Sequence, residues 1–358
     1  MGKLSDRLRP PASAPADRGV GVIPPTPPGV FPPVAASPLP SSPPHSGEVI
    51  ARGMSEHLRE ILAQRFTQQA EATPRSPSRG PCTLCGGRGY QVAQRGDLSH
   101  ARVCECQGTC RGCGGRGYTM EQRGSYEYMV TCRHCSGLHQ RVALFNQSLV
   151  PALFADKSLM NFDGTDPRRK LAWEASIKFA AAYPQVPSGL LLVGPPGLGK
   201  THLMCGILRE LTLEKGVRCL FKDFFILLSE VKEAWATDSF EAEILKPLTE
   251  ADVLVVDELG KGRNSDWELN LLDEIVCKRY NRKQLTLFTT NFPLKRDNTR
   301  RQEENQPPAP PLETLAERVS ERVYSRLQEM CTPILMDGED WRVKKVRSRP
   351  PERVVPPR

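Results

Sequence analysis

The sequence lacks the features that would direct the chain into a membrane or out of the cell. No apolar run reaches about 18 residues, so we expect no membrane span. The first ten residues, MGKLSDRLRP, hold no apolar signal-peptide core, and Asp6 stands where a myristoylation motif needs serine or threonine. We therefore expect a cytoplasmic protein, in which clustered cysteines hold metal more often than they form disulfides.

Apolar residues are in short supply, because only 39% of the 358 residues are hydrophobic and 6% are aromatic. The shortage is uneven along the chain. Thirteen of the 33 prolines fall between residues 10 and 44, so we expect 1–47 to be a disordered linker or a proline-rich docking ligand. Residues 150–345 have ordinary globular composition and enough length for a core. A chain of this length is typical of two or three domains.

An amphipathic segment follows the proline-rich stretch, within residues 48–81. Ser55 can cap a helix whose apolar positions recur at three-to-four spacing. Such a helix is too short to be a domain, so it either binds a partner or packs on a neighbouring domain. Its apolar positions are Leu58, Ile61, Leu62 and Phe66.

The net charge of +8 is concentrated at the opposite end of the chain. Residues 341–358 hold seven lysines and arginines against one glutamate, which gives +6. We expect residues 346–358 to form a disordered basic tail. This tail either binds a polyanion such as DNA or is simply solvated.

Residues 82–139 contain an internal repeat with an offset of 28 residues, because PCTLCGGRGYQVAQRGDLSHARVCEC aligns with TCRGCGGRGYTMEQRGSYEYMVTCRHC. Each copy offers a CxxC pair, a stretch able to form a β-hairpin, and a second cysteine pair. Zn²⁺ takes four ligands in a tetrahedron, and a CxxC turn places two thiolates on one ion, so we expect two structural zinc ions. The expected ligands are Cys82, Cys85, Cys104 and Cys106 in the first copy and Cys110, Cys113, Cys132 and Cys135 in the second.

The CxxCxGxG patterns at Cys82–Gly89 and Cys110–Gly117 resemble the cysteine-rich domain of DnaJ-type chaperones. The resemblance implies zinc binding but not chaperone function, since no J-domain signature stands upstream. In that family the outer cysteine pairs share one ion and the inner pairs share the other. Here we expect sequential pairing, because each repeat then closes its own site. His134 and His139 are expected to be bystanders.

The most specific motif lies in GLLLVGPPGLGKTHL, residues 189–203, where an apolar run, a GxxxxGK[ST] loop and a helical pattern follow one another. Its glycines let backbone N–H groups approach phosphate oxygens at a helix N-terminus. Lys200 is expected to reach the β- and γ-phosphates of ATP, and Thr201 to supply a hydroxyl to Mg²⁺. The expected nucleotide-binding residues are Gly194, Pro195, Pro196, Gly197, Leu198, Gly199, Lys200, Thr201, His202 and Asp257.

Two further apolar runs end in polar residues that suit a nucleotide site. ADVLVVDELG, residues 251–260, ends in two acids: Asp257 is expected to hold Mg²⁺ with Thr201, and Glu258 to activate the attacking water. Adjacent strand residues point in opposite directions, so both acids can serve one site only where the strand ends and the chain turns. In QLTLFTTN, residues 284–291, Asn291 can orient water or contact the γ-phosphate.

The segment Leu315–Met330 has the spacing of a helix with an apolar stripe and an arginine stripe. Arg318, Arg322 and Arg326 recur every four residues. An arginine can act in trans on the γ-phosphate of a neighbouring subunit, and we expect Arg326, or else Arg322, to do so. The alternative is a solvated face paired with neighbouring glutamates. The apolar stripe consists of Leu315, Val319, Val323 and Leu327.

Apolar runs alternate with helical patterns over residues 150–345, which predicts an α/β fold with a parallel sheet and crossover helices. The runs are at 190–193, 217–221, 253–256 and 285–289. Together the motifs resemble the DnaC and DnaI helicase loaders and the related IstB transposition helpers, which are AAA+ ATPases. The resemblance spans about Met160 to Arg342 and depends on GLLLVGPPGLGKTHL, VLVVDELG, LLDEIVCKRY, TLFTTN, RVYSRL and MDGEDWR.

The resemblance implies a P-loop AAA+ parallel sheet with no lid domain, so no second sensor arginine is expected, and it assigns the sensor 1 role to Asn291. The polar segment 295–313 looks like an insertion before the arginine helix. In the family, ATP-bound subunits form an open spiral that grips DNA and remodels a helicase ring. We therefore expect a Mg²⁺-dependent ATPase of DNA replication, homo-oligomeric when ATP is bound, with single-stranded DNA and a replicative helicase as partners.

The region that precedes the ATPase domain contacts the helicase in the family, and we expect the zinc repeat to do the same. Two alternatives stay open. One is an IstB-like transposition helper that polymerises on duplex DNA and recruits a transposase. The other is a zinc-dependent protein-binding adaptor whose ATPase is a weak switch. All three hypotheses imply ATP, Mg²⁺ and two Zn²⁺ ions, and none involves a membrane.

Overall fold

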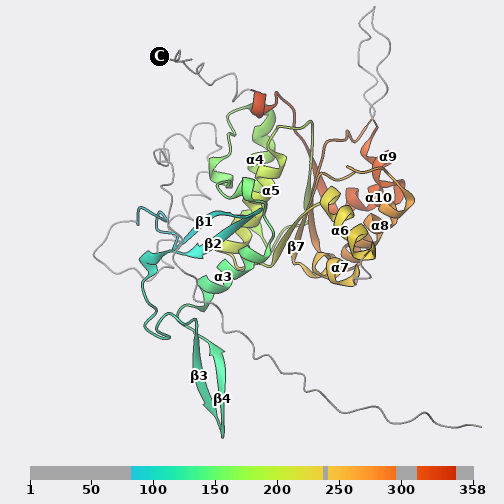
Figure 1. The fold of residues 1–358 in the computed structure, drawn as a ribbon. Coiled ribbons are helices and arrows are strands. Elements are labelled where there is room, and N and C mark those ends of the chain that lie inside the picture. Colours follow the sequence, from blue (N-terminus) through green and yellow to red (C-terminus); the bar gives the residue numbers. More distant parts are fainter. Residues whose placement is uncertain (1–81, 237–240, 296–312, 344–358) are drawn as a thin grey trace, which may run out of the picture. The chain divides into compact units, whose positions relative to one another are not determined.

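The computed structural model describes residues 82–236, 241–295 and 313–343, which all lie within one compact unit, 46–358 (Figure 1). The proline-rich segment 1–47, the helix expected within 48–81, most of the 295–313 segment and the basic tail 346–358 lie outside these residues. Among the helices in the described ranges, none combines the length and apolarity needed to span a bilayer.

A five-stranded parallel sheet forms the centre of the fold, in the strand order β6-β7-β8-β5-β9, which confirms the predicted α/β class. β5 and β7 are buried at every position, so these central strands occur in the sequence as continuous apolar runs. The strands are β5 (Gly189–Val193), β6 (Cys219–Asp223), β7 (Val253–Asp257), β8 (Leu285–Thr290) and β9 (Cys331–Leu335), and β6 begins at Cys219 rather than at Val217.

Helices cover both faces of this sheet (Figure 1). One face carries α3 (Ser136–Gln147), α4 (Pro167–Ala182) and α5 (Lys200–Arg209), which continues into the π-helical turn η4 (Glu210–Glu214). The other face carries α6 (Phe224–Ala236), α7 (Glu241–Glu250), α8 (Asp266–Asn281), α9 (Leu315–Val319) and α10 (Glu321–Met330). Side chains of β5 alternate between two cores, since Leu190 and Leu192 belong to one and Leu191 and Val193 to the other.

The described residues also contain three short 3-10 helices, η1 (Glu105–Gln107), η2 (Ala152–Phe154) and η3 (Leu159–Asn161).

Local capping explains where several elements begin. Ser265 and Glu268 form a reciprocal capping box at the start of α8, and Thr314 and Glu317 form another at the start of α9. Each box satisfies backbone N–H groups that have no partner within the helix.

The segment 315–330 is not one continuous helix, contrary to the prediction. α9 ends at Val319, and Ser320 adopts a φ of +73°, which takes the chain out of the helical path. The Ser320 hydroxyl then accepts a hydrogen bond from the Val323 N–H at 3.4 Å and caps α10. The predicted apolar stripe is nevertheless fully buried, and it packs in the core shared with α6 and α8.

The two cysteine-rich repeats form two antiparallel hairpins with equivalent registers, β1 (Tyr90–Arg95) with β2 (Leu98–Val103) and β3 (Tyr118–Arg123) with β4 (Tyr126–Thr131). Tyr90 pairs with Val103, and Tyr118 pairs with Thr131. The first hairpin belongs to the main core, because Tyr90 and Ala101 are buried in the cluster that holds α3 and α5. The second hairpin is exposed along most of both strands.

Specific contacts attach the first hairpin to the sheet domain. The Asn146 side chain of α3 accepts a hydrogen bond from the Ala101 N–H at 2.7 Å and donates one to the Ala101 carbonyl at 3.1 Å. The Tyr90 hydroxyl donates to the Glu214 carboxylate of η4. An internal repeat has therefore been used in two ways: one copy is built into the domain core and the other is presented to solvent.

We predict that Tyr90→Ala and the equivalent Tyr118→Ala will differ in their effect on stability. Tyr90 is 3% exposed within the main core, so truncating its ring costs about 3 kcal/mol, as for other large aromatic side chains in cores. Tyr118 is only partly buried, so its truncation costs less than about 1 kcal/mol. Denaturant unfolding of both variants measures the difference, and equal losses would contradict the structural division between the repeats.

Candidate nucleotide and metal sites

The carboxyl ends of three neighbouring strands bring the predicted nucleotide-site residues to one edge of the sheet. β5 leads into Gly194, β7 ends at Asp257, and β8 ends just before Asn291. β8 lies between β5 and β7, so these three ends are adjacent in space. This edge is where open parallel α/β sheets bind ligands.

The loop between β5 and α5 has a backbone that only glycine allows at its key positions. Gly194 and Gly197 have φ values of +155° and +80°. A Cβ atom on Gly194 would lie 2.2 Å from the Met336 carbonyl oxygen, and one on Gly197 would lie 2.0 Å from the Asp340 carboxylate. The glycine requirement therefore comes from both conformation and close packing.

Lys200 and Thr201, at the N-terminus of α5, point their polar groups into this loop. The Lys200 Nζ atom donates to the carbonyl oxygens of Gly194 and Pro195, at 2.7 Å each. The Thr201 hydroxyl donates to the Asp257 carboxylate, at 2.9 Å to Oδ2 and 3.2 Å to Oδ1. The arrangement sets a cation beside a glycine-rich loop and a hydroxyl beside a carboxylate, the pair of oxygen ligands that suits Mg²⁺.

Burial shapes the charges of this site. Burial lowers the pKa of Lys200 to about 8, and the carboxylates of Asp257 and Glu258 oppose that shift. Burial raises the pKa of Asp257 to about 6, while hydrogen bonds from Thr289 and Thr201 oppose the shift. A bound polyphosphate and a divalent cation would compensate these buried charges, so the residues present fit both groups.

Glu258 follows Asp257 at the point where β7 ends, as expected for two acids that serve one site. Its φ of +55° turns the chain out of the strand. Its carboxylate is 32% exposed and forms an ion pair with Lys261. Asn291 is exposed directly after β8. The structure therefore brings Glu258 and Asn291 to the same edge as Lys200, Thr201 and Asp257.

Thr289, which the sequence analysis did not single out, connects the two acids. Its hydroxyl donates to Asp257 Oδ1 at 2.5 Å and accepts the Glu258 N–H at 3.0 Å. The neighbouring Thr290 hydroxyl donates to the Leu259 carbonyl at 2.9 Å, so both threonines hold the turn after β7. Thr289 is 1% exposed. The TT pair at the end of the QLTLFTTN run was the available signal, but strand pairing was needed to interpret it.

Two predicted loop residues have side chains that serve other purposes. The His202 Nε2 atom donates to the Ser158 carbonyl at 2.9 Å, and the ring packs edge-on against Phe162. Leu198 is fully buried in the core. Their side chains therefore face away from the polar groups of the loop, and only their backbone groups remain for phosphate contacts.

The three arginines of the predicted stripe make different contacts and differ in exposure. Arg318 donates to the carbonyls of Gly260 and Gly262, which follow Glu258. Arg326 is 18% exposed and pairs with Asp273 of α8 at 2.6 Å, whereas Arg322 is 67% exposed and lies 3.5 Å from the same carboxylate. The break at Ser320 separates Arg318 from the other two. Arg322 therefore presents the more accessible guanidinium, and Arg326 is the better anchored.

The closing segment MDGEDWR lies directly on the loop, a placement that the sequence analysis did not predict. The Met336 N–H donates to the Val193 carbonyl at 2.7 Å, and the Trp341 N–H donates to the Gly197 carbonyl at 3.1 Å. The Trp341 ring lies 5.4 Å from the buried guanidinium of Arg169, on α4. Residues after β9 therefore complete one wall of the loop.

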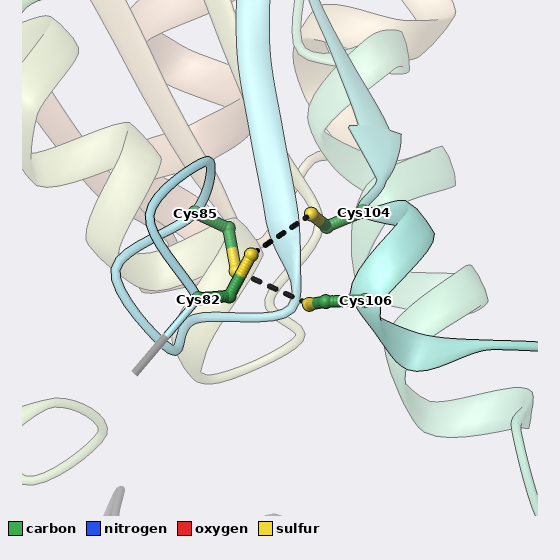
Figure 2. Close-up of side chains that lie close together, drawn as sticks. All are labelled: Cys82, Cys85, Cys104 and Cys106. Carbon is green, nitrogen blue, oxygen red and sulfur yellow. Dashed lines mark hydrogen bonds between the residues drawn. The ribbon is translucent and has the colours of Figure 1, made fainter. Parts of the chain in front are cut away.

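The eight cysteines of the repeats form two separate groups of four, and in each group the sulfur atoms lie within 4.8 Å of one another. The grouping follows the expected sequential pairing. In the first group, Figure 2 shows Cys82 beside Cys104 and Cys85 beside Cys106, with sulfur separations of 3.9 and 3.4 Å. In the second, the corresponding separations are 3.8 Å (Cys110–Cys132) and 3.6 Å (Cys113–Cys135).

These separations fit a tetrahedral thiolate site. With Zn–S bonds of about 2.3 Å, the sulfur atoms of a tetrahedron lie about 3.8 Å apart. Backbone N–H groups of Gly89 and Gly117 donate to the Cys85 and Cys113 sulfur atoms, at 3.4 and 3.2 Å. Such donors stabilise thiolates and orient metal ligands. Both groups can therefore hold a metal ion.

Comparison with known proteins agrees with the nucleotide site. The sequence pattern of the family described as "IstB-like ATP binding protein" matches residues 142–306, which include the loop, Asp257 and Thr289. Residues 142–306 are an IstB-like ATP-binding domain. The matched residues start within α3 and include β5 to β8 of the sheet.

Individual relatives of this domain include replication proteins. Over 148 residues the chain is 27% identical to the replicative helicase loader DnaC of Escherichia coli (strain K12). This match covers 41% of this chain and 60% of DnaC. Over 183 residues it is 27% identical to the phage-like element PBSX protein XkdC of Bacillus subtilis (strain 168). This match covers 49% of this chain and 60% of XkdC. The chain therefore spans less than two thirds of the length of these relatives.

Among solved structures, a crystal structure of the DnaC helicase loader is 30% identical in sequence to this chain. The match covers 52% of this chain and 99% of that one, with a TM-score of 0.44. The strand pairing of this chain itself establishes the α/β class.

We predict that the two cysteine groups will be separable by mutation. Cys85→Ser and Cys113→Ser should each lower the bound zinc by one ion per chain, because each removes one of four ligands. Only Cys85→Ser should also lower the midpoint of denaturant unfolding, since the first hairpin is part of the main core. Metal analysis and unfolding curves measure both effects. Loss of both ions from one substitution would disprove two independent sites.

We predict that Thr289→Val will slow Mg²⁺-dependent ATP turnover while leaving ATP binding intact. Valine keeps the shape but removes the hydrogen bond to the Asp257 carboxylate. Losing such a bond costs about 1.5–3 kcal/mol, which is about a 10- to 100-fold loss in rate. Thr289→Ser should restore most of the rate. Thr290→Val is the control, since the Thr290 hydroxyl donates to the Leu259 carbonyl and accepts the Phe292 N–H rather than bonding to the Asp257 carboxylate. Equal rates for the two valine variants would refute the role of Thr289.

Proposed function

We propose that this protein binds and hydrolyses ATP and uses the cycle to load a replicative helicase onto DNA. The single observation that carries the ATPase proposal is the convergence of Lys200, Thr201, Asp257 and Glu258 at one edge of the sheet. Membership of the domain in an ATP-binding family supports the same assignment.

In the proposed mechanism the loop from Gly194 to Gly199 cradles the phosphates with its backbone N–H groups. Lys200 exchanges its two carbonyl partners for phosphate oxygens and neutralises their charge. Thr201 and Asp257 would hold Mg²⁺, which when bound would offset the charge that develops on the phosphates. With the Thr201 hydroxyl engaged by the metal, Thr289 would remain as the donor that orients the Asp257 carboxylate.

Glu258 acts as the base that removes a proton from the attacking water. In the structure its carboxylate is paired with Lys261, so this ion pair must open before the carboxylate can accept a proton. Asn291, at the end of the next strand, orients the water or contacts the γ-phosphate. The left-handed turn at Glu258 supports this division of labour, since it sends the two acids in different directions.

Two observations favour a helicase loader over other ATPases. The relatives of the domain include replicative helicase loaders, and the second cysteine-rich repeat provides an exposed hairpin that suits a protein partner. We propose that ATP-bound subunits assemble with one another and with single-stranded DNA, and that the repeats contact the helicase. The two cysteine groups would hold one Zn²⁺ ion each as structural ions.

A second candidate function is a transposition helper that recruits a transposase to DNA. The observation that favours it is the family match, because the pattern that fits this domain is described as IstB-like. The ATP chemistry is the same in both cases. The partner protein and the strandedness of the DNA distinguish the two functions.

We predict that Glu258→Gln will bind ATP, hydrolyse it at least about 100-fold more slowly, and hold its partners in the ATP-bound assembly. Affinity purification of this variant with ATP should retain a replicative helicase. Lys200→Ala is the matched control: it loses ATP binding and should retain none. Capture of a transposase would establish the second function instead. Normal hydrolysis by Glu258→Gln would place the base elsewhere.

We also predict that an arginine of α10 will act on a neighbouring subunit's ATP. Arg326→Ala should lose turnover but keep ATP binding, and mixing it with Lys200→Ala should restore part of the activity, because each variant supplies what the other lacks. Arg322→Ala tests the more exposed alternative in the same assay. Wild-type rates in Arg326→Ala would remove it as the trans-acting residue.

A further inference from the structure

The second hairpin exposes to solvent the face whose equivalent is buried in the first hairpin. In each hairpin alternate residues share a face, so Tyr90 and Val92 lie with Ala101 and Val103 on one side of the first. All four are buried or pack against the main core. The equivalent residues of the second hairpin, 28 positions later, are Tyr118, Met120, Met129 and Thr131.

Two apolar side chains of this equivalent face are open to solvent. Met120 and Met129 are directly paired across the strands and are 50% and 67% exposed. They replace Val92 and Ala101, which are smaller and face the core. A pair of flexible, polarisable methionine side chains adapts to the shape of an apolar partner.

An arginine guanidinium lies beside the tyrosine of this face in both repeats. Arg88 donates from Nε to the Cys85 carbonyl at 3.3 Å, and its guanidinium lies 5.8 Å from the Tyr90 ring centre. Arg116 repeats this arrangement, at 3.1 Å from the Cys113 carbonyl and 5.7 Å from the Tyr118 ring. The metal-binding turn thus holds an arginine beside the tyrosine in each copy.

In the first repeat the arginine–tyrosine pair has an acidic partner. The Tyr90 hydroxyl donates to the Glu214 carboxylate, and the charges of Glu214, Arg209 and Arg88 all act on this tyrosine. Next to Glu214, helix α3 covers the hairpin with an apolar stripe. That stripe is Leu138, Val142 and Phe145, at helical spacing.

We propose that the second hairpin docks an acidic amphipathic helix from another protein. Apolar side chains of that helix cover Met120 and Met129, as the main core covers Val92 and Ala101. A carboxylate of the partner meets Tyr118 and Arg116, as Glu214 meets Tyr90. An acidic amphipathic helix fits this face because its carboxylate complements the charge beside the Arg116–Tyr118 pair. Its apolar side chains match the neighbouring Met120–Met129 pair. This docking does not depend on ATP hydrolysis.

The test uses the full-length protein in its source cells with a photo-crosslinking amino acid at position 129. The matched control places it at Tyr126, which is 71% exposed and lies on the opposite face of the same hairpin. We expect one protein to crosslink from position 129 and not from 126. The crosslinked peptide should carry apolar residues at helical spacing and an adjacent aspartate or glutamate.

Affinity measurements with the captured protein, once purified, complete the test. Met120→Asp and Arg116→Glu should each weaken binding at least about tenfold, as expected for residues at the centre of an interface. Tyr126→Asp should leave it unchanged. Because Arg116 also bonds to the metal-binding turn, zinc content at the wild-type level is required of every variant, and Met120→Asp tests the face without that contact.

Four outcomes would overturn the proposal. These are equal crosslinking from positions 126 and 129, crosslinking to a second copy of this chain, crosslinking to nucleic acid, and no crosslink from position 129. Binding that survives Met120→Asp would overturn it as well.

Discussion

The buried carboxylate of Asp257 is the point on which the nucleotide site depends. It ends the inner strand β7 and accepts hydrogen bonds from Thr201 of α5 and Thr289 of β8. The loop helix, the acidic strand and the neighbouring strand therefore meet at one charged group. Because burial disfavours its charge, the carboxylate needs these donors, and both are threonine hydroxyls. The same Thr289 hydroxyl also holds the Glu258 backbone, so the two acids are positioned together.

The cysteine-rich repeats illustrate how one unit can be used in two ways. Both copies have the same hairpin register, the same grouping of four sulfur atoms, and the same arginine beside a tyrosine. The first copy is built into the core through Tyr90 and Ala101, whereas the second exposes Met120 and Met129. A small hairpin buries little apolar surface, so four metal–thiolate bonds can hold the second copy in shape without a core of its own.

Much of the fold could be predicted from the sequence. The apolar runs gave four of the five parallel strands of the sheet nearly to their bounds, since central strands are buried on both faces and need continuous apolar residues. The repeated cysteine spacing predicted two groups of four. The helix break at Ser320 could not be predicted, because the spacing of apolar residues is the same for one helix and for two packed on the same core.

The sequence by itself determined the local chemistry: a glycine-rich loop before a helix, acids at a strand end, and paired cysteines at repeated intervals. These depend on residues close in the chain. Only the tertiary structure decided what joins them. Thr289, the MDGEDWR wall and the different roles of Arg318, Arg322 and Arg326 arise from contacts between segments far apart in sequence. The two repeats diverge for the same reason, because burial depends on what packs against a face as well as on the residues in it.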